Sequence, residues 1–353
     1  MGERDFTIKQ GCSIDRRSFL KISGVTGLGL ASGGIIPNTA RAFKSNNKSR
    51  KISGTRLAMG TSVSMTLIYP STEKAEKALE MAYEEIDILS GLMNRFDNRS
   101  PIARLNKEGR LADAHPDIIE VVAGAIKYFR LTNGAFDISI KPVIDLFKKS
   151  FSREKNKYPS EKEIKDALDL VGSDMIELKG RDIRFRKKGM GITLDGIAKG
   201  YIVDRASKIL LSHNIENHLI NAGGDIKATG VRLDGKPWTV AVQDPAKRNN
   251  SLDIIYLTDT AIATSGNYEN YFDREKMFHH IVNPKTGLSP IINVSASVIA
   301  PTAMEADILA TTLLLMNPEQ GAGFIDSLPQ CESLVISRGH RKKMSAGWKS
   351  VAR

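Results

Sequence analysis

The stretch ITLDGIAKGYIVDRA, residues 192–206, joins a short apolar segment to the start of a helix. Apolar residues recur at helical spacing through the rest of the stretch and just beyond it. Asp195 is predicted to be the N-cap of this helix, and Gly196 its first residue. Lys199 then lies near the positive end of the helix dipole, where a cation is mildly unfavourable. The position of Lys199 therefore raises the question of which group its side chain faces.

The composition is that of an ordinary globular protein. The chain has 353 residues, which is enough for one large or two ordinary domains. Hydrophobic residues make up 41% and charged residues 26%, a composition that argues against disorder. The formal net charge is +11. No dense run of Lys and Arg with interleaved aromatics occurs, so a nucleic-acid surface is less favoured than attraction to a phosphate-bearing ligand or an acidic partner.

The N-terminal segment is predicted to be a signal and not part of the fold. Arg16 and Arg17 precede a weakly apolar, glycine-rich stretch, a pattern that resembles a twin-arginine export signal. Ala40-Arg41-Ala42 is a small-x-small cleavage site, so residues 1–42 are expected to be removed and the mature protein to be periplasmic. The alternative, a membrane helix, is disfavoured because residues 22–36 are too few and too glycine-rich to span a bilayer comfortably. We expect no transmembrane segment in the mature protein.

The remaining chain is predicted to be one domain. Residues 43–52 form a polar, basic linker, and residues 53–349 form a single large catalytic domain. Cys331 is the one cysteine left after the signal is removed, because Cys12 lies within it. An internal disulfide and a thiolate metal site are therefore excluded.

The distribution of periodicities predicts an α+β fold. After a strand at 62–69, long amphipathic helices are expected over 79–93 and 117–131, followed by a lysine-rich helical insertion near 150–170. Strands dominate later, with the helix from Asp195 and another over 303–316 between them. The predicted strands are 183–186, 217–221, 238–243, 253–264, 293–300 and 333–338. Early helices and late strands do not give the regular βαβ alternation of a parallel sheet.

The helix PTAMEADILATTLLLM, residues 301–316, carries the strongest chemical signal. Thr302 and Glu305 form a capping box, which starts the helix near Ala303. Asp307 and Thr311 are four residues apart, so they share one face of an otherwise apolar helix. A buried carboxylate needs a partner. That partner is either a hard cation such as Mg²⁺, which would also accept a phosphate, or an arginine or backbone amides elsewhere.

Two glycine-containing motifs follow predicted strands. NAGGD (221–225) and ATSGN (263–267) could let the backbone approach a phosphate or ribose, or could be ordinary turns. His279 and His280 precede an Ile-Val-Asn-Pro-Lys-Thr-Gly segment, predicted as a strand and a turn. A histidine there could be a general base, a metal ligand or a strand-end cap. The lack of Gly-x-Ser-x-Gly, Walker, His-Glu-x-x-His and Cys-x-x-Cys motifs in the mature chain removes most hydrolase, P-loop and zinc classes.

Taken together, eight ordered motifs resemble the ApbE family of FAD:protein FMN transferases. They are MGTSVSM (59–65), MNRFDNRSPIARLN (93–106), GAFDISIKPVIDLF (134–147), LDGIAKGYIVDRA (194–206), NAGGDIKATG (221–230), ATSGNY (263–268), HIVNPKTG (280–287) and EADILATTLLLM (305–316). The resemblance covers about residues 55 to 315, nearly the whole mature domain.

The resemblance implies an ApbE-like mixed fold and a Mg²⁺-dependent reaction that moves FMN from FAD to a threonine or serine hydroxyl of a partner protein, releasing AMP. It implies Gly196, through its main-chain carbonyl, with Asp307 and Thr311, as metal ligands, and His280 as the catalytic residue. The implied partners are exported flavoproteins with FMN-binding domains, in ion-pumping or electron-transfer systems, and no nucleic acid. The implied FAD contacts are Met59, Phe96, Ala135, Phe136, Asp137, Thr193, Lys199 and Ile281.

The sequence departs from the family pattern at three positions. Asn283 and Thr193 stand where Asp is common, and Phe96 where Tyr or another aromatic is common. An anionic ligand would explain Lys199 in the first helical turns. Three alternatives use the same residues: hydrolysis of FAD to FMN and AMP, non-catalytic FAD storage, or an interaction module without flavin affinity.

Overall fold

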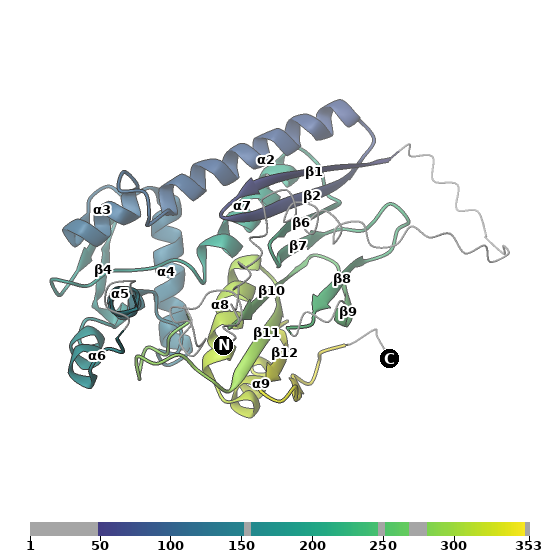
Figure 1. Cartoon of the computed structure of the whole chain (residues 1–353). Helices are drawn as coiled ribbons and strands as arrows, with labels where there is room; N and C mark the ends of the chain where they lie inside the picture. The colour runs from purple at the N-terminus through teal and green to yellow at the C-terminus, as the bar shows by residue number, and fades with distance from the viewer. Residues whose placement is uncertain (1–48, 152–156, 246–250, 268–280, 350–353) are drawn as a thin grey trace, which may run out of the picture. The chain divides into compact units, whose positions relative to one another are not determined.

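An eight-stranded antiparallel sheet organises the fold. In this computed structural model its strand order is β1-β2-β6-β7-β10-β11-β12-β13 (Figure 1). The structure describes residues 49–151, 157–245, 251–267 and 281–349. The strands of this sheet are β1 (Arg50–Ala58), β2 (Thr61–Tyr69), β6 (His218–Ala222), β7 (Asp225–Thr229), β10 (Thr260–Gly266), β11 (Asn293–Ala300), β12 (Glu332–Ser337) and β13 (Lys342–Met344).

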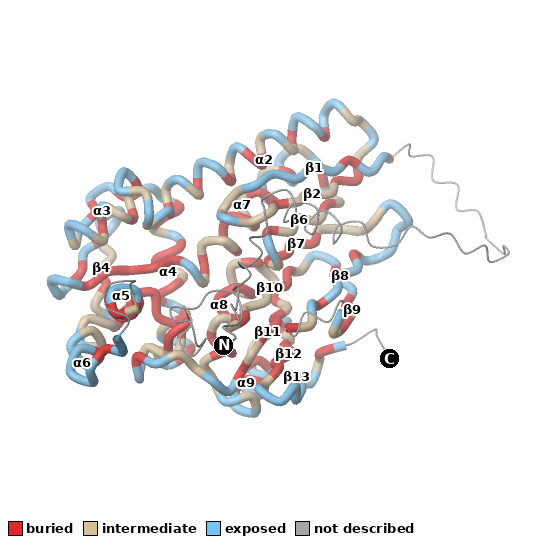
Figure 2. Tube along the Cα trace, in the orientation of Figure 1, coloured by how far each residue is buried: buried red, intermediate tan, exposed pale blue. Residues whose placement is uncertain are grey.

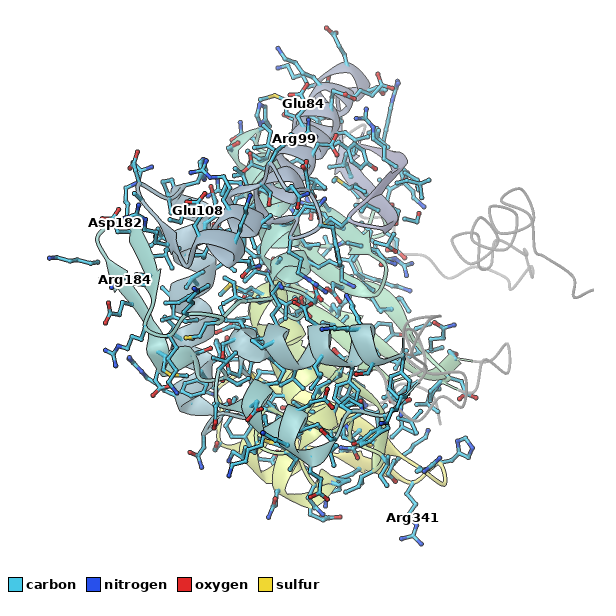
Figure 3. All side chains as sticks on the ribbon, turned by 60° about the vertical axis from the view of Figure 1, so that its left-hand side comes forward. Glu84, Arg99, Glu108, Asp182, Arg184 and Arg341 are labelled. Atoms are coloured by element: carbon cyan, nitrogen blue, oxygen red, sulfur yellow. The ribbon has the colours of Figure 1, made fainter. Side chains whose placement is uncertain are left out.

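Two smaller sheets accompany it. One has the order β3-β5-β4, with β3 (Arg110–Leu111), β5 (Asp182–Phe185) and β4 (Ile176–Lys179), and Figure 3 shows Asp182 and Arg184 on its outward side. The other is the hairpin of β8 (Trp238–Gln243) and β9 (Ser251–Leu257). The helices are α2 (Thr72–Met93), α3 (Pro101–Glu108), α4 (Pro116–Leu131), α5 (Lys141–Ser150), α6 (Glu161–Leu168), α7 (Ala198–Ser212), α8 (Ala303–Leu315) and α9 (Pro318–Asp326).

Helices cover one face of the large sheet and a hairpin covers the other. α8 packs on β10 and β11, while α7 lies between α8 and α2 (Figure 1). On the opposite face, β8 and β9 pack on the sheet in a separate apolar cluster that includes Trp238 and Trp348. Figure 2 shows buried residues concentrated on α8 and the central strands, and exposed residues along the outer sides of α2 and α6. α8 is buried nearly all round, which explains its continuous apolar sequence.

The crossing of α7 and α8 is unusually close. A Cβ on Gly200 of α7 would overlap the carbonyl group of Ala303 and lie 2.8 Å from Cα of Met304. Asp204, one turn further along α7, accepts hydrogen bonds from the backbone N–H groups of Ala303 and Met304, each at 2.9 Å. These bonds satisfy two donors at the start of α8 that have no partner within the helix. The contact thus fixes α8 against α7.

Most predicted elements are found, and the α+β class is confirmed. The predicted strand at 293–300 is β11, and the predicted cap is seen where the Thr302 side chain accepts from the Glu305 N–H at 3.1 Å. The returning half of the capping box is not formed, because the Glu305 carboxylate accepts from the hydroxyls of Thr302 and Tyr128 instead. The predicted strand over 253–264 is wrong, because positive φ at Asp259 divides it into β9 and β10. Residues 50–52, expected in the linker, open β1.

The start of the helix after Ile192 also differs from prediction. α7 begins at Ala198, so Asp195 and Gly196 form a turn before it, and Ile197 is its N-cap without a side-chain hydrogen bond. Asp195 is therefore not the cap, because its carboxylate is bound to Arg95 instead. In the part of the chain that the structure describes, no helix is both long and apolar enough to cross a bilayer.

Candidate active site

A pocket opens where five segments of the chain meet. The segments are the 135–144 region that leads into α5, the turn before α7, the ends of β7 and β10, the 281–284 segment, and α8. Lining residues from each include Phe136, Lys199, Asp225, Ile281 and Asp307. The pocket is thus formed by residues far apart in the sequence, which the packing of α7 and α8 on the sheet brings together.

Asp307 and Thr311 line the pocket from α8, as their helical spacing predicts. Thr311 Oγ1 lies 3.1 Å from the hydroxyl of Ser265 on β10, so two hydroxyls and one carboxylate converge. The turn before α7 approaches the same place, since a Cβ on Gly196 would lie 2.9 Å from Thr311 Oγ1. Glycine is therefore needed at this position for the backbone to come so close to the helix.

Two buried carboxylates share one ammonium group at the base of the pocket. Lys199 Nζ lies 3.3 Å from Oδ2 of Asp225, whose side chain is only 2% exposed. Asp307 accepts a hydrogen bond from the Gly200 N–H at 3.3 Å. Burial, and then the neighbouring Asp225 carboxylate, raise the pKa of Asp307 well above its usual value, while Lys199 opposes the shift. The two carboxylates and one ammonium can be neutralised by a proton or by a bound cation, so the site is suited to bind a cation.

The position of Asp225 depends on a tight hairpin. Gly223 and Gly224 connect β6 to β7 with φ angles of 60° and 104°, a left-handed conformation that favours glycine. The Asn221 side chain accepts from the Gly224 N–H at 3.0 Å and stabilises the turn. The motif is therefore an ordinary hairpin turn, as one of the two interpretations held, but it also sets Asp225 into the pocket wall.

Asp137 has mainly a structural environment. Its carboxylate accepts bonds from the N–H and hydroxyl groups of Ser139 and Ser173, at 2.6 to 3.3 Å. Burial raises the pKa of this carboxyl, and the four hydrogen bonds oppose the shift. Thr193 donates its backbone N–H to the Ile138 carbonyl at 2.8 Å, which ties the segment before α7 to the one that carries Asp137. Both residues thus shape the wall of the pocket.

A cluster of charged residues and one aromatic ring lies beside the pocket. Arg95, in the loop after α2, makes two hydrogen bonds to the carboxylate of Asp195, which lines the pocket. The guanidinium carbon of Arg95 lies 4.2 Å from the centroid of the Phe96 ring, and Lys148 Nζ lies 5.1 Å from it. Burial, and then the Arg95 charge, lower the pKa of Lys148. Both cation–ring distances are within the range of cation–π interactions.

Most of the predicted site residues lie in one place. Those that line the pocket are Ala135, Phe136, Asp137, Thr193, Gly196, Lys199, Ile281, Asp307 and Thr311. Met59 and Phe96 are not among the lining residues: Met59 lies in the turn between β1 and β2, and Phe96 is exposed. His279 and His280 lie outside the described residues, so the catalytic role of His280 stays a prediction. Ile281–Asn283, expected in a strand, are not in one.

The donor groups fit a hard cation. Among residues 49–151, 157–245, 251–267 and 281–349, no three His, Cys, Asp or Glu side chains are placed to bind a metal together. Asp307 would therefore be joined by neutral oxygens, namely the hydroxyls of Thr311 and Ser265 and a carbonyl from the turn at Gly196. Carboxylate, hydroxyl and carbonyl oxygens are suitable ligands for Mg²⁺, which usually keeps waters and binds substrate phosphate as well.

Comparison with known proteins identifies the class and then the family. A FAD:protein FMN transferase of Vibrio cholerae is 29% identical over 303 residues, which are 82% of this chain and 90% of the relative. The crystal structure of the ApbE protein from Thermotoga maritima matches with a TM-score of 0.76 and 29% identity, over 84% of this chain and 97% of that one.

A second structure agrees with the first. The flavin transferase ApbE from Vibrio cholerae matches with a TM-score of 0.70 and 26% identity, over 84% of this chain and 98% of that one. The fold is thus that of flavin transferases. The ApbE family model matches residues 59–335, and the chain belongs to this family.

Three features of the site were not assigned from the sequence. Asp225 has no role predicted from the sequence, although an aspartate directly after two glycines at a hairpin end is a usable signal. The Arg95–Asp195 pair joins residues 100 positions apart, and no sequence pattern indicates it. No sequence pattern indicates the role of Asp204 at the start of α8 either, because its partners are backbone groups.

Proposed function

We propose that this protein is a Mg²⁺-dependent FAD:protein FMN transferase. The observation that carries the proposal is the meeting of Asp307, Thr311, Ser265 and Lys199 in one pocket of a chain that belongs to the ApbE family. The reaction breaks the pyrophosphate bond of FAD and forms a phosphoester between FMN and a threonine or serine hydroxyl of a partner protein. AMP leaves, and the hydroxyl proton passes to a base.

Each pocket residue has a distinct task in this reaction. Lys199 places a positive charge beside the pyrophosphate, while Asp225 fixes the direction of the lysine side chain. Asp307, Thr311 and the Gly196 carbonyl would hold Mg²⁺, which when bound supplies charge neutralisation at the reacting phosphate. The 281–284 segment closes one wall with the buried side chains of Ile281 and Val282 and limits the access of water. His280 is the predicted base that takes the hydroxyl proton.

Two other activities of the same pocket are alternatives. If water takes the place of the acceptor hydroxyl, FAD is hydrolysed to FMN and AMP. If neither attacks, the protein only stores or delivers FAD. The buried carboxylate beside two hydroxyls favours catalysis over storage, because a storage site has no need of a cation at the pyrophosphate.

The central experiment mixes the protein, FAD, Mg²⁺ and an isolated FMN-binding domain, and then looks for flavin fluorescence on a denaturing gel. A fluorescent acceptor band that is lost with EDTA is expected. Accumulation of AMP and free FMN without a band would support hydrolysis instead. Intact bound FAD with no product would leave only storage.

A matched pair of variants on α8 tests the metal site. Thr311→Val removes the hydroxyl beside Ser265, and we expect the Mg²⁺ concentration for half-maximal rate to rise about tenfold or more, since loss of even an outer-shell partner of a metal site costs at least that much. Thr312→Val changes the neighbouring residue, whose hydroxyl donates to the Ile308 carbonyl at 2.7 Å within the helix. Its Mg²⁺ requirement should equal that of the wild type. An equal change in both variants would argue against a metal ligand at Thr311.

We also propose that the protein works in the periplasm after export by the twin-arginine route. The basis is the Arg16–Arg17 pair and the cleavage site ending at Ala42, which lie outside the described residues. Replacing both arginines by lysine should keep the full-length chain in the cytoplasm, as fractionation would show. Normal export of that variant would rule out this route.

A further inference from the structure

Arg95 lies beside the pocket but does not line it. Its side chain is only 8% exposed although it lies in a loop at the surface of the helical layer. Nε donates to Oδ1 of Asp195 at 3.2 Å and Nη2 donates to Oδ2 at 2.7 Å. This two-point geometry fixes both the position and the orientation of the carboxylate, which a lysine could not do.

One end of this contact lies at the pocket. Asp195 lines the pocket and directly precedes Gly196, whose backbone lies against Thr311. The turn formed by Asp195, Gly196 and Ile197 has no side-chain cap for α7 to hold it. The Arg95 fork thus ties this turn to the loop after α2.

The other end of the contact is an exposed aromatic ring. Phe96 is 70% exposed, although aromatic side chains are usually buried. Its backbone is nevertheless fixed, because its N–H donates to Oδ1 of Asn94 at 3.0 Å. The ring has the Arg95 guanidinium carbon 4.2 Å and Lys148 Nζ 5.1 Å from its centroid. The ring is therefore oriented by cations and not by a surrounding apolar core.

A purely structural role explains these observations poorly. Asp195 is 46% exposed, so water could solvate its carboxylate without Arg95. An exposed ring likewise gains little stability from being held in one place. Fixing both groups is useful if they contact a ligand, because a pre-oriented contact loses less entropy on binding.

We propose that Arg95 is a positioning residue for FAD. Through Asp195 it fixes the turn that carries Gly196 at the base of the pocket, and through Phe96 it holds a flat surface beside the pocket on which a planar ring of FAD stacks. The inference rests on the proposed function for the identity of the ligand. It assigns Arg95 no contact with the reacting atoms.

The test measures FAD affinity without any acceptor protein. FAD is titrated by flavin fluorescence into the wild type and into Arg95→Met, Asp195→Asn and Phe96→Leu. Arg95→Met is expected to raise the FAD dissociation constant about tenfold, equivalent to about 1.4 kcal/mol. In the separate transfer assay with an acceptor, KM for FAD should rise by a similar factor. Arg95→Lys, which keeps the charge but loses the fork, should recover only part of the affinity.

Arg99→Met is the matched control. Arg99, labelled in Figure 3, lies in the same loop. Its side chain is 90% exposed and pairs with Asp97 two residues away. Its removal should leave FAD affinity unchanged. The double variants Arg95→Met/Asp195→Asn and Arg95→Met/Phe96→Leu should weaken FAD binding by less than the sum of the two single losses, because each partner acts together with Arg95.

Titrations with FMN and with ADP decide which ring stacks on Phe96. Weaker FMN binding with unchanged ADP binding assigns the flavin ring, and the reverse assigns the adenine ring. A lower melting temperature of Arg95→Met with unchanged FAD affinity would overturn the proposal, as would fully additive double variants. If the wild type binds FAD but modifies no acceptor, the proposed function fails, and the affinities still decide the role of Arg95.

Discussion

At the scale of single residues, the position of Lys199 is explained by its surroundings. The ammonium lies between the buried carboxylate of Asp225, 3.3 Å away, and the pocket that also holds Asp307. The unfavourable end of the helix dipole is therefore offset by two negative groups of the protein itself. A phosphate ligand would add a third, so the lysine serves both the folded state and the ligand.

A substitution at Lys199 should separate these two contributions. Lys199→Met leaves Asp225 buried without its ammonium partner, and we expect the free energy of unfolding to fall by about 3 kcal/mol. Lys199→Met/Asp225→Asn removes both charges and should recover most of the stability, but not the affinity for FAD. Thermal unfolding and flavin titration of both variants provide the check. A double variant as unstable as the single one would show that the ion pair is not the cause.

Prediction from sequence succeeds for residues whose spacing has a local meaning. Asp307 and Thr311 were found because four residues in a helix place them on one face. The partner of Lys199 was not, because Asp225 lies on a strand that only the folded sheet brings to α7. Phe96 and Met59 were named from family resemblance alone, and the structure places neither among the lining residues.

At the scale of elements, the crossing of α7 and α8 determines the site. Gly200 lets the two helices approach, and the same residue donates its N–H to Asp307. Elements with strong local signals, such as α8, were predicted with nearly correct bounds. The sequence predicts a linker over residues 50–52, at the start of β1, because β1 is an edge strand whose residues are largely exposed. The β9–β10 turn was missed because Asp259 takes positive φ without a glycine.

Gly200→Ala should disrupt this crossing. The new methyl group would overlap the backbone of Ala303, which cannot move aside as a side chain can, and we expect a loss of about 3 kcal/mol. Gly91→Ala is the control, because a Cβ on Gly91 of α2 meets nothing within 4 Å. That change should stabilise the protein by about 0.5 to 1 kcal/mol, as alanine favours helix over glycine. Urea unfolding measures both, and a tolerated Gly200→Ala would contradict the close crossing.

The contact between α7 and β6 should make stability depend on pH. His218 of β6 is buried, its Nδ1–H donates to the Ile215 carbonyl at 2.8 Å, and its Nε2 accepts from the Ser207 hydroxyl at 2.7 Å. Burial, aided by the charge of Lys227, lowers the pKa of His218 from 6.5 to about 4. Between pH 6.5 and about pH 4, the unfolded chain therefore binds a proton at His218 that the native protein does not bind.

Stability should therefore be unaffected by His218 above pH 6.5 and fall as the pH is lowered from 6.5 towards 4. Between pH 7.5 and pH 5 the expected loss from this group is about 2 kcal/mol. His218→Gln should flatten this part of the curve, whereas His340→Gln, on an exposed turn, should retain the wild-type slope. Identical slopes for wild type and His218→Gln would refute the assignment.

At the scale of the whole molecule, stability and ligand binding depend on different faces of the sheet. The pocket lies with α7 and α8 on one face, and the cluster with Trp238 and Trp348 lies on the other. Trp348 Nε1 donates to Oδ2 of the buried Asp253 at 2.9 Å. Most of that cluster comes from the segment after residue 230, and Ile68, Ile226 and Ala228 join it from β2 and β7.

Trp348→Phe should lower stability without affecting the pocket. The ring keeps most of its apolar surface, but Asp253 loses a buried donor, and we expect a loss of about 2 kcal/mol. FAD affinity below the melting temperature should equal that of the wild type. A calorimetric scan and a flavin titration on the same sample test both statements. Weakened binding would mean that the two faces are coupled.

The pairing of β2 with β6 has a consequence for folding during synthesis on the ribosome. Thr66 of β2 lies opposite Leu219 of β6, about 150 residues later in the chain. At translation rates of roughly 5 to 20 residues per second, the inner edge of the nascent β1–β2 hairpin waits on the order of 10 to 30 s for its neighbour. During that interval the unpaired backbone groups of this edge can form hydrogen bonds with other chains. A chaperone that binds nascent strands would therefore increase the yield of folded enzyme.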